Sequence, residues 1–310
     1  MDTKEYDIIV VGAGPAGLTA AIYGRRAGKS VLILEKETFG GQITHSPKVE
    51  NYPGFPAISG NELAEKLIDQ ALSLGSELDV DGVISVLDAG EWKSVITERS
   101  EYLARAVIIA SGARHRVLGL EREEEFTGKG VSYCVLCDGA FYQGKPVAVI
   151  GGGNSALQEA ILLSETSSHV TVIQNLEKLT GEGTLIKNLC SRSNVKILYN
   201  TIVTALEGKE ELKALELLNT AKNEKSRLEV DGIFVAIGQE PENAPFAEVA
   251  PLDERGYIVS SEDCLTPTPG IFVAGDCRTK SVRQITTATG DGASAALAAC
   301  KYIENTRFSS

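Results

Sequence analysis

Apolar and polar positions along the first forty residues follow the order strand, turn, helix, strand. Residues 6–11 form a β-branched apolar run, and a glycine-rich turn follows at once. An alanine-rich stretch over residues 18–27 has helical character, and residues 31–34 form a second apolar run that ends in Glu35. Two short apolar runs on either side of one helical segment predict a complete βαβ unit.

The same pattern occurs a second time, 139 residues further along the chain. Residues 147–150 form an apolar run, a helix is predicted over residues 155–164, and residues 170–173 form the returning strand. When the two copies are aligned without gaps, their glycines coincide and Glu35 falls on Gln174. The chain therefore contains an internal repeat of dinucleotide-binding units.

Three further apolar runs end in glycine-marked turns, and such runs suit strands buried on both faces of a parallel sheet. One run, at residues 106–113, precedes the second repeat, whereas those at residues 232–238 and 270–276 follow it. The predicted fold class is therefore α/β, with two Rossmann-like three-layer domains, the second inserted into the first. The predicted bounds are 1–113 with 246–310 for the first domain and 114–245 for the second.

Composition narrows the class of protein. At 310 residues the chain exceeds the usual size of a single hydrophobic core, which agrees with two domains. Its 42 acidic against 30 basic residues give a net charge of -12, which argues against nonspecific binding to nucleic acid because phosphates require a basic face. No apolar run approaches the length of a membrane span, and the polar N-terminus does not resemble a signal peptide. We expect a cytoplasmic protein.

Cys134 and Cys137 form the only close pair among six cysteines, and Asp138 follows them directly. A Cys-x-x-Cys pair can close a disulfide, bind a metal, or cycle between dithiol and disulfide. A structural zinc site normally has four ligands, and the chain has no second pair of this kind and only three histidines. We predict no metal, and a cytoplasmic setting favours a catalytic pair over a structural disulfide. Asp138 either serves this pair or is a capping or turn carboxylate.

The first glycine loop has the features of a dinucleotide site. Gly12 and Gly14 allow a tight turn and a close approach of backbone N–H groups to a pyrophosphate at the helix N-terminus. Glu35 follows Gly12 by 23 positions, where it can accept hydrogen bonds from a ribose. The alternative for either glycine loop is a strand-turn-helix junction that binds nothing.

Together, these motifs resemble the low-molecular-weight thioredoxin reductases, which are FAD-dependent disulfide oxidoreductases with two nucleotide-binding domains. The resemblance covers essentially the whole chain and implies FAD as cofactor, thioredoxin as substrate and a homodimer. Two of the segments assigned to FAD below have another interpretation: residues 51–54 could form an ordinary Pro-Gly turn, and Arg283 could be a surface charge. The residues that the resemblance assigns to FAD are Gly12, Gly14, Pro15, Ala16, Glu35, Gly40, Gly41, Gln42, Asn51, Ala110, Gly112, Gly275, Asp276, Arg283, Gln284 and Ile285.

The resemblance also assigns roles within the redox motif. It implies that Cys137 is the sulfur nearer the flavin and that Asp138 supplies a proton as the dithiol forms. Exchange requires a thiolate, because a thiol is a poor nucleophile. We therefore expect electrons to pass from the flavin to Cys134 and Cys137 and then, by disulfide exchange, to thioredoxin.

The electron donor is the point at which the chain departs from the family pattern. Members that use NADPH end the second strand of the second repeat in His-Arg-Arg, with another arginine shortly after, and these residues clamp the 2'-phosphate. Residues 174–180 contain no arginine here, and Gln174 is a neutral, weaker acceptor for the ribose of NADH. Nevertheless, the loop that would bind a pyridine nucleotide is intact at Gly151, Gly153, Asn154 and Ser155.

A branch of this family that lacks the arginines includes members that take electrons from reduced ferredoxin. We favour ferredoxin or another protein carrier as the donor, with NADH and NADPH as alternatives. Two other functions stay open: a flavin-dependent oxidase of small dithiols, in which oxygen reoxidises the flavin, and a non-enzymatic flavin-binding redox sensor.

Overall fold

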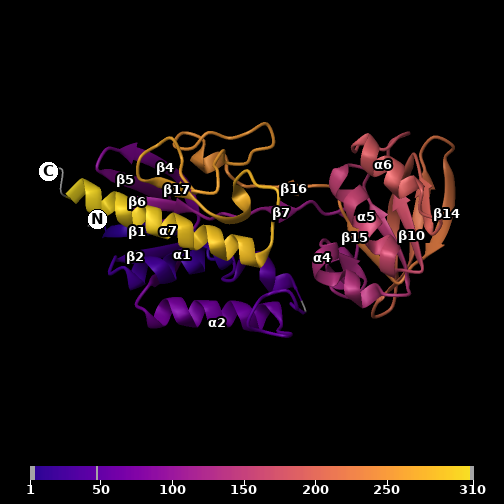
Figure 1. The fold of residues 1–310 in the computed structure, drawn as a ribbon, viewed down its shortest axis with the longest axis horizontal. Helices are drawn as coiled ribbons and strands as arrows, with labels where there is room; N and C mark the ends of the chain where they lie inside the picture. The colour runs from indigo at the N-terminus through magenta and orange to yellow at the C-terminus, as the bar shows by residue number, and fades with distance from the viewer. Residues whose placement is uncertain (1–3, 47, 308–310) are drawn as a thin grey trace. The chain divides into compact units, whose positions relative to one another are not determined.

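The computed structural model describes residues 4–46 and 48–307, and their contacts divide the chain into two units. The first unit extends to Arg114 and resumes at Glu240, and the second comprises residues 115–239 (Figure 1). The second unit is therefore one continuous insertion. The predicted bounds were 113 and 246, so the second crossing occurs earlier in the chain than expected. There, β16 (Gln239–Glu240) pairs with β7 (Arg114–His115).

The first unit is built on a seven-stranded sheet with the order β3-β2-β1-β6-β5-β4 and with β17 beside β6. Strands β3, β2, β1, β6 and β17 are parallel to one another. Strand β5 pairs antiparallel with β6, and β4 pairs antiparallel with β5. The strands are β1 (Lys4–Val11), β2 (Val31–Glu35), β3 (Glu77–Val80), β4 (Val83–Ala89), β5 (Trp92–Thr97), β6 (Glu101–Ile109) and β17 (Ile271–Val273). The helices are α1 (Pro15–Arg26), α2 (Gly60–Ser73), α7 (Ile285–Arg307) and the short 3₁₀ helices η1 (Gly41–His45), η3 (Ala244–Phe246) and η4 (Gly275–Cys277).

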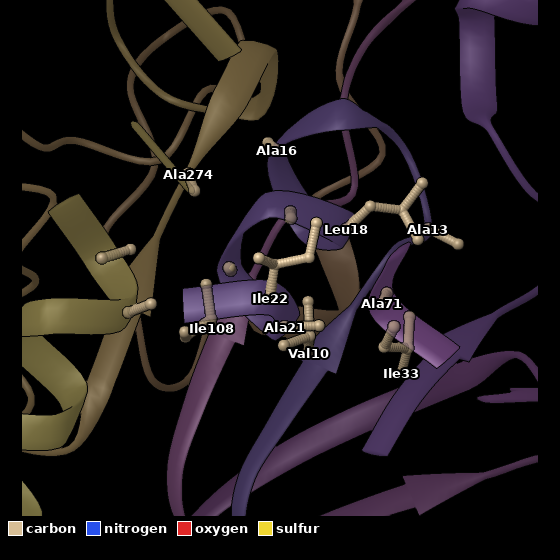
Figure 2. Packing of buried hydrophobic residues seen from close by; sticks show 14 of the residues in the cluster. Val10, Ala13, Ala16, Leu18, Ala21, Ile22, Ile33, Ala71, Ile108 and Ala274 are labelled. Carbon is tan, nitrogen blue, oxygen red and sulfur yellow. The ribbon is translucent and has the colours of Figure 1, made fainter. Parts of the chain in front are cut away.

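Alternation along β1 supplies both faces of this sheet with apolar side chains. Ile8 and Val10 are fully buried in a cluster with α1, α2 and α7, and Figure 2 shows Val10 beside Ala21 and Ile22 in this packing. Ile9 belongs to a second cluster on the opposite face, formed with the β4–β5 hairpin and residues 246–258. Each fully buried aliphatic side chain contributes roughly 1.5–3 kcal/mol. The unit thus has the three layers that were predicted.

Close packing of α1 against α7 depends on Gly292. A Cβ at this position would lie 2.1 Å from the carbonyl oxygen of Ala16 and 3.1 Å from the backbone nitrogen of Ala20. The glycine therefore brings the first turn of α1 against α7. This contact fixes the start of α1 relative to the C-terminal helix, and α1 follows the first glycine loop directly.

The second unit has a parallel five-stranded sheet with the order β11-β10-β9-β15-β8 and an antiparallel sheet of β12, β13 and β14. One face of the parallel sheet packs on α5 and α6 and the other packs on β12–β14. Its strands are β8 (Val131–Ser132), β9 (Pro146–Ile150), β10 (His169–Ile173), β11 (Val195–Leu198), β12 (Thr201–Gly208), β13 (Leu212–Asn219), β14 (Glu224–Glu229) and β15 (Gly232–Val235). Its helices are α3 (Glu123–Phe126), α4 (Val135–Asp138), η2 (Gly139–Tyr142), α5 (Asn154–Thr166) and α6 (Gly183–Cys190).

Two predicted helices begin earlier than expected. The helix predicted over residues 18–27 begins at Pro15, since proline suits the first helical position and its missing N–H costs nothing there. A packing helix was also expected over the alanine-rich residues 292–302, and these residues lie within α7, which begins earlier, at Ile285. In addition, no helix in the described part of the chain is long and apolar enough to cross a bilayer.

Candidate functional site

The first glycine loop lies where the strand order of the sheet reverses. From β1, the chain passes through α1 to β2 on one side, whereas β6 lies on the other. Gly12 follows β1 with a positive φ of 106°, and a Cβ there would lie 2.3 Å from the carbonyl oxygen of Ala110, just past β6. Such a crevice at the carboxyl ends of parallel strands is where open α/β sheets bind ligands.

The loop leaves free space at the start of α1. Gly14 has an ordinary backbone conformation, and a Cβ on it would meet nothing within 4 Å. Among the described residues no side chain caps this helix, so its first N–H groups stay available for an anion. Gly40 donates its N–H to the carbonyl of Ala13 at 2.9 Å, and a Cβ on Gly41 would lie 3.1 Å from Gly14 Cα. The predicted segment of Gly40, Gly41 and Gln42 therefore lies against this space.

Glu35 joins the end of β2 to the loop. Its Oε2 accepts a hydrogen bond from the Ala13 N–H at 2.8 Å, and its Oε1 accepts one from the Glu37 N–H at 3.1 Å. A carboxylate in this position can accept from ribose hydroxyls with its remaining lone pairs. The structure thus brings Glu35 to the glycine loop, as the 23-residue spacing predicted.

Asp276 carries a buried oxygen that needs a partner. It lies in η4, and its Oδ1 has no hydrogen-bond partner within the described residues. Burial raises the pKa of Asp276 to about 6, although the positive charges of Lys280 and Arg283 act in the opposite direction. An unsatisfied buried carboxyl oxygen is costly unless a ligand group reaches it. This oxygen therefore fits a hydroxyl-bearing ligand such as the expected FAD.

Arg283 has a structural function that the motif did not reveal. Its guanidinium donates to the carbonyl oxygens of Asp276, Arg278 and Lys280, each at 3.2 Å, and its carbon lies 4.2 Å from the centre of the Tyr257 ring. The interpretation as a surface charge is therefore wrong. Arg283 fixes the chain around Asp276, and the guanidinium could assist a cofactor by positioning that carboxyl.

The remaining residues predicted for FAD lie in the same unit. Asn51 Nδ2 donates to Gln284 Oε1 at 3.1 Å, and Asn51 lines an open hollow of about 590 Å³ formed by residues 50–56. Ile285 begins α7, and Gly112 has a positive φ of 71°. The glycine loop, Glu35 and the unpartnered oxygen therefore fit a dinucleotide cofactor.

A buried ionic cluster behind η4 was not predicted. Asp291 accepts hydrogen bonds from Arg278 at 2.8 and 2.9 Å, from Lys280 at 2.8 Å and from the Gly275 N–H at 3.0 Å. Burial alone would raise the pKa of Asp291, but the bonds and charges of Arg278 and Lys280 outweigh it and lower the pKa. Single charged residues scattered over fourteen positions give no sequence signal. The cluster holds the Gly275 turn in place.

We expect Asp276→Asn to stabilise the apoprotein while weakening FAD binding. The folded state holds the Asp276 proton up to about pH 6, whereas an unfolded aspartate loses it near its ordinary pKa of 3.8. The free energy of unfolding therefore falls as the pH rises through that window. Asparagine has no proton to lose in this range, so the apoprotein gains on the order of 3 kcal/mol at neutral pH.

Urea unfolding of the apoprotein across this pH range, with flavin titration of each variant, measures both effects. The variant lacks an ionised acceptor for a ligand hydroxyl, so FAD affinity falls roughly tenfold. Identical pH slopes in the two proteins would contradict the assignment of the slope to Asp276.

In the second unit, Cys134 and Cys137 are joined in a disulfide with a Cα–Cα distance of 5.3 Å. Cys134 caps α4, because its sulfur accepts a hydrogen bond from the Cys137 N–H at 3.2 Å. Both cysteines are partly exposed, and Leu136 between them is 62% exposed. An N–H directed at the Cys134 sulfur would stabilise a thiolate there after reduction.

Asp138 is held beside the disulfide by a side-chain contact. Its Oδ2 accepts a hydrogen bond from the Ser132 hydroxyl at 2.7 Å, while its Oδ1 is buried without a partner in the described chain. Asp138 makes no capping hydrogen bond, so the interpretation as a capping carboxylate is wrong. Burial raises the pKa of Asp138, and the bond from Ser132 opposes that shift. A carboxyl with a raised pKa can hold and deliver a proton.

The second glycine loop repeats the backbone geometry of the first. The Gly151 N–H donates to the carbonyl of Ile173 at 2.9 Å, as that of Gly12 does to Leu34 at 2.8 Å. A Cβ on Gly151 would lie 2.4 Å from the carbonyl oxygen of Ala236, the counterpart of Ala110. The two repeats therefore have the same turn at the same place in their sheets.

Side chains around the second loop differ from those around the first. Gln174 is 3% exposed, and its Nε2 donates to the carbonyl of Lys178 at 3.0 Å. A Cβ on Gly152 would lie 2.4 Å from that nitrogen. The Gly152 carbonyl accepts from both the N–H and the hydroxyl of Thr180. Asn154, at the start of α5, exchanges hydrogen bonds with Glu182, and its neighbour Ser155 is exposed.

Comparison with known proteins gives consistent matches over the whole chain. Residues 6–292 match the family described as pyridine nucleotide-disulphide oxidoreductase. A thioredoxin reductase of Bacillus subtilis (strain 168) is 42% identical over 304 residues, which are 98% of this chain and 96% of the relative. The 34.2 kDa protein in the rubredoxin operon of Clostridium pasteurianum is 41% identical, over 97% of this chain and 98% of that protein. The crystal structure of thioredoxin reductase from Streptococcus pyogenes MGAS5005 superposes with a TM-score of 0.94 at 36% identity, over 98% and 100% of the two chains.

Proposed function

This chain belongs to the thioredoxin reductase family of FAD-dependent disulfide oxidoreductases, and we propose that it reduces thioredoxin with electrons from a protein carrier such as ferredoxin. The electrons pass through FAD to the Cys134–Cys137 disulfide. We propose that it acts in the cytoplasm as a homodimer.

The observation that carries the choice of donor is the environment of Gln174. Its amide is buried and hydrogen-bonded to the loop that follows it, whereas a nucleotide site needs a side chain that can turn to a ribose. Asn175 and Leu176, at the positions of the missing arginines, are exposed and carry no charge. A 2'-phosphate would find no guanidinium fork there. These features disfavour NADPH and support a donor that does not use this loop.

The name of one relative supports a protein as the electron donor. The Clostridium pasteurianum relative is named for a rubredoxin operon. Bound FAD supplies a redox centre that can accept electrons from such a carrier and pass them on in pairs. The residues of this chain then have to bind FAD, take up the electron pair and provide protons.

We assign the proton donor and the nucleophile to Asp138 and Cys134. Reduction breaks the disulfide and leaves one thiol and one thiolate, so one proton is needed at once. Asp138 is half-buried, accepts a hydrogen bond from Ser132 and has a raised pKa, which suits it to supply that proton. The Cys137 N–H would stabilise a thiolate on Cys134, which suits Cys134 to attack the disulfide of thioredoxin. Cys137 then reforms the disulfide and releases the reduced substrate.

We expect reduced ferredoxin, and not micromolar NADPH, to reduce the flavin. The purified flavoprotein is mixed anaerobically with reduced ferredoxin, NADH or NADPH in separate experiments, and the bleaching of the flavin absorbance is followed. Because residues 174–180 contain no arginine, and Glu177 stands beside their single lysine, Lys178, the 2'-phosphate should give NADPH no advantage over NADH. Rapid bleaching by micromolar NADPH would contradict this proposal.

A variant carrying Asn175→Arg and Leu176→Arg is the matched test of the same argument. Both positions are exposed, so arginines fit there without repacking the core. Charge-assisted hydrogen bonds to the phosphate should raise NADPH affinity by roughly tenfold or more while leaving that of NADH unchanged. An equal effect on both nucleotides would show that the added charge does not act on the 2'-phosphate.

A further inference from the structure

Ser132 is a buried hydroxyl next to the redox motif. It lies at the end of β8, opposite Phe234 of β15, and is 3% exposed. Its Oγ donates to Asp138 Oδ2 at 2.7 Å and accepts from the backbone N–H of Cys134 at 3.2 Å. One hydroxyl therefore contacts both the carboxyl group and the backbone of the disulfide.

The two hydrogen bonds fix the direction of the hydroxyl proton. Because the Cys134 N–H occupies an acceptor position of Ser132, the proton points toward an acceptor of its own. Asp138 Oδ2 is the nearer acceptor, since the Cys134 carbonyl oxygen is 3.4 Å away. When Asp138 is neutral, its own proton is then left on Oδ1, which is buried and has no partner in the part of the chain described.

We propose that Ser132 is a positioning residue for disulfide reduction, which holds the Asp138 carboxyl with its transferable proton on Oδ1. This inference rests on the proposed role of Asp138 as the acid. In the step that it serves, the S–S bond breaks and the sulfurs take up two electrons from the reductant. One sulfur takes the Asp138 proton and becomes a thiol, and the other is left as a thiolate. The Asp138 carboxylate recovers its proton from water.

Other titratable groups near α4 set the conditions of the test, since η2 and α5 pack against this helix. Burial raises the pKa of Tyr142 in η2 to about 12, with the charge of Asp138 adding to the shift, so Tyr142 stays neutral near pH 7. Burial also raises the pKa of Glu159 in α5 to about 7. Glu165, the other acid of α5, is exposed. Because Glu159 would change its charge within the pH series, every variant is also measured with Glu159→Gln, and a pH dependence that persists there does not come from Glu159.

The experiment follows reduction of the disulfide without donor or thioredoxin. Oxidised holoenzyme is mixed anaerobically with dithiothreitol over a series of pH values and quenched with an alkylating reagent, and the modified cysteines are counted by intact mass. Dithiothreitol becomes a cyclic disulfide, and Cys134 and Cys137 become thiols. The ratio of each variant's rate to that of its parent removes the ionisation of the reagent from the comparison.

At the lowest pH values, we expect Ser132→Ala to reduce its disulfide at about one tenth of the parent rate. This loss is smaller than the roughly 10²- to 10⁴-fold effect of removing a positioned acid, because Asp138 itself is still present. The ratio should rise with pH, because loss of the Ser132 bond raises the pKa of Asp138 further and keeps it protonated to higher pH. Ser132→Thr retains the hydroxyl and should keep a ratio near one. In an Asp138→Asn background, Ser132→Ala should cause no further loss.

A loss that is independent of pH, or equal in the Asp138→Asn background, would overturn the inference and make Ser132 a support of the backbone only. An Asp138→Asn variant that is reduced at the parent rate would overturn the acid role itself, and the inference with it. Results with thioredoxin or with any electron donor do not enter this measurement, so failure of the proposed donor or substrate is detected separately.

Discussion

Replacing Cys134 with serine is expected to lower the rate of thioredoxin reduction by about a thousandfold or more, the scale of losing an essential catalytic group. Serine cannot form the disulfide with Cys137 that takes up the electron pair, and its hydroxyl is not a nucleophile at neutral pH. FAD should remain bound, because the residues that fit FAD belong to the other unit. The rate is measured with oxidised thioredoxin and a reagent that reports its new thiols.

Cys190→Ser provides the matched control for this experiment. Cys190 is the exposed free cysteine at the end of α6, so its loss removes a reactive thiol without touching the redox pair. We expect the parent rate in this variant. An equal loss in both variants, or near-normal turnover without Cys134, would contradict the assignment of the dithiol. Oxygen uptake with small dithiols that exceeds thioredoxin reduction would instead identify an oxidase.

Gly14→Ala is expected to weaken FAD binding by about a hundredfold while leaving the stability of the apoprotein unchanged. The protein leaves the space for this methyl group empty, and the backbone has an ordinary conformation there. A pyrophosphate at the start of α1 requires that same space, since the glycine permits close approach of the backbone. The measurements are fluorescence titration of the apoprotein with FAD and thermal unfolding without it.

Two other glycines separate a ligand effect from a folding effect. Gly17→Ala should destabilise the apoprotein itself, because its Cβ would lie 1.9 Å from the carbonyl oxygen of Gly12. Gly183, at the start of α6, also has empty space at its Cβ but belongs to the other unit, so Gly183→Ala should bind FAD like the parent. A Gly14→Ala protein with unchanged FAD affinity would show that the pyrophosphate does not approach this position.

Patterns that depend on neighbouring residues predicted the βαβ units well. Apolar runs and glycine spacing correctly predicted β1, β2, β9 and β10. The spacing from Gly12 to Glu35 correctly predicted a carboxylate next to the first glycine loop. The antiparallel sheet of β12–β14 was not predicted, because its outer strand is mostly exposed and has a single apolar side chain, Leu228, so it gives no signal of alternation. The early start of α7 was missed because packing of Gly292 on α1 overrides the poor helix propensity of glycine.

The sequence was least informative about the partners of individual side chains. Arg283 and Gln174 stood at motif positions, yet both donate to carbonyl oxygens of their own chain. Ser132 belongs to no motif, and its role is indicated by its hydrogen bonds to Asp138 and to the Cys134 N–H. The spacing of a motif shows which residue type stands at a position. The hydrogen-bond partner of that residue depends on how the surrounding segments pack in the folded chain.

The two ends of the inserted unit have a practical consequence. The Arg116 N–H donates to the Gly238 carbonyl at 3.0 Å, and the His115 and Gln239 side chains lie 3.4 Å apart, so the insertion begins and ends at one place. A segment whose ends already meet adds little loop-closure entropy to its host, and cutting or rejoining it there disturbs few contacts. We therefore expect that residues 115–239, with Cys134, Cys137 and Asp138, can be exchanged between related reductases as one piece.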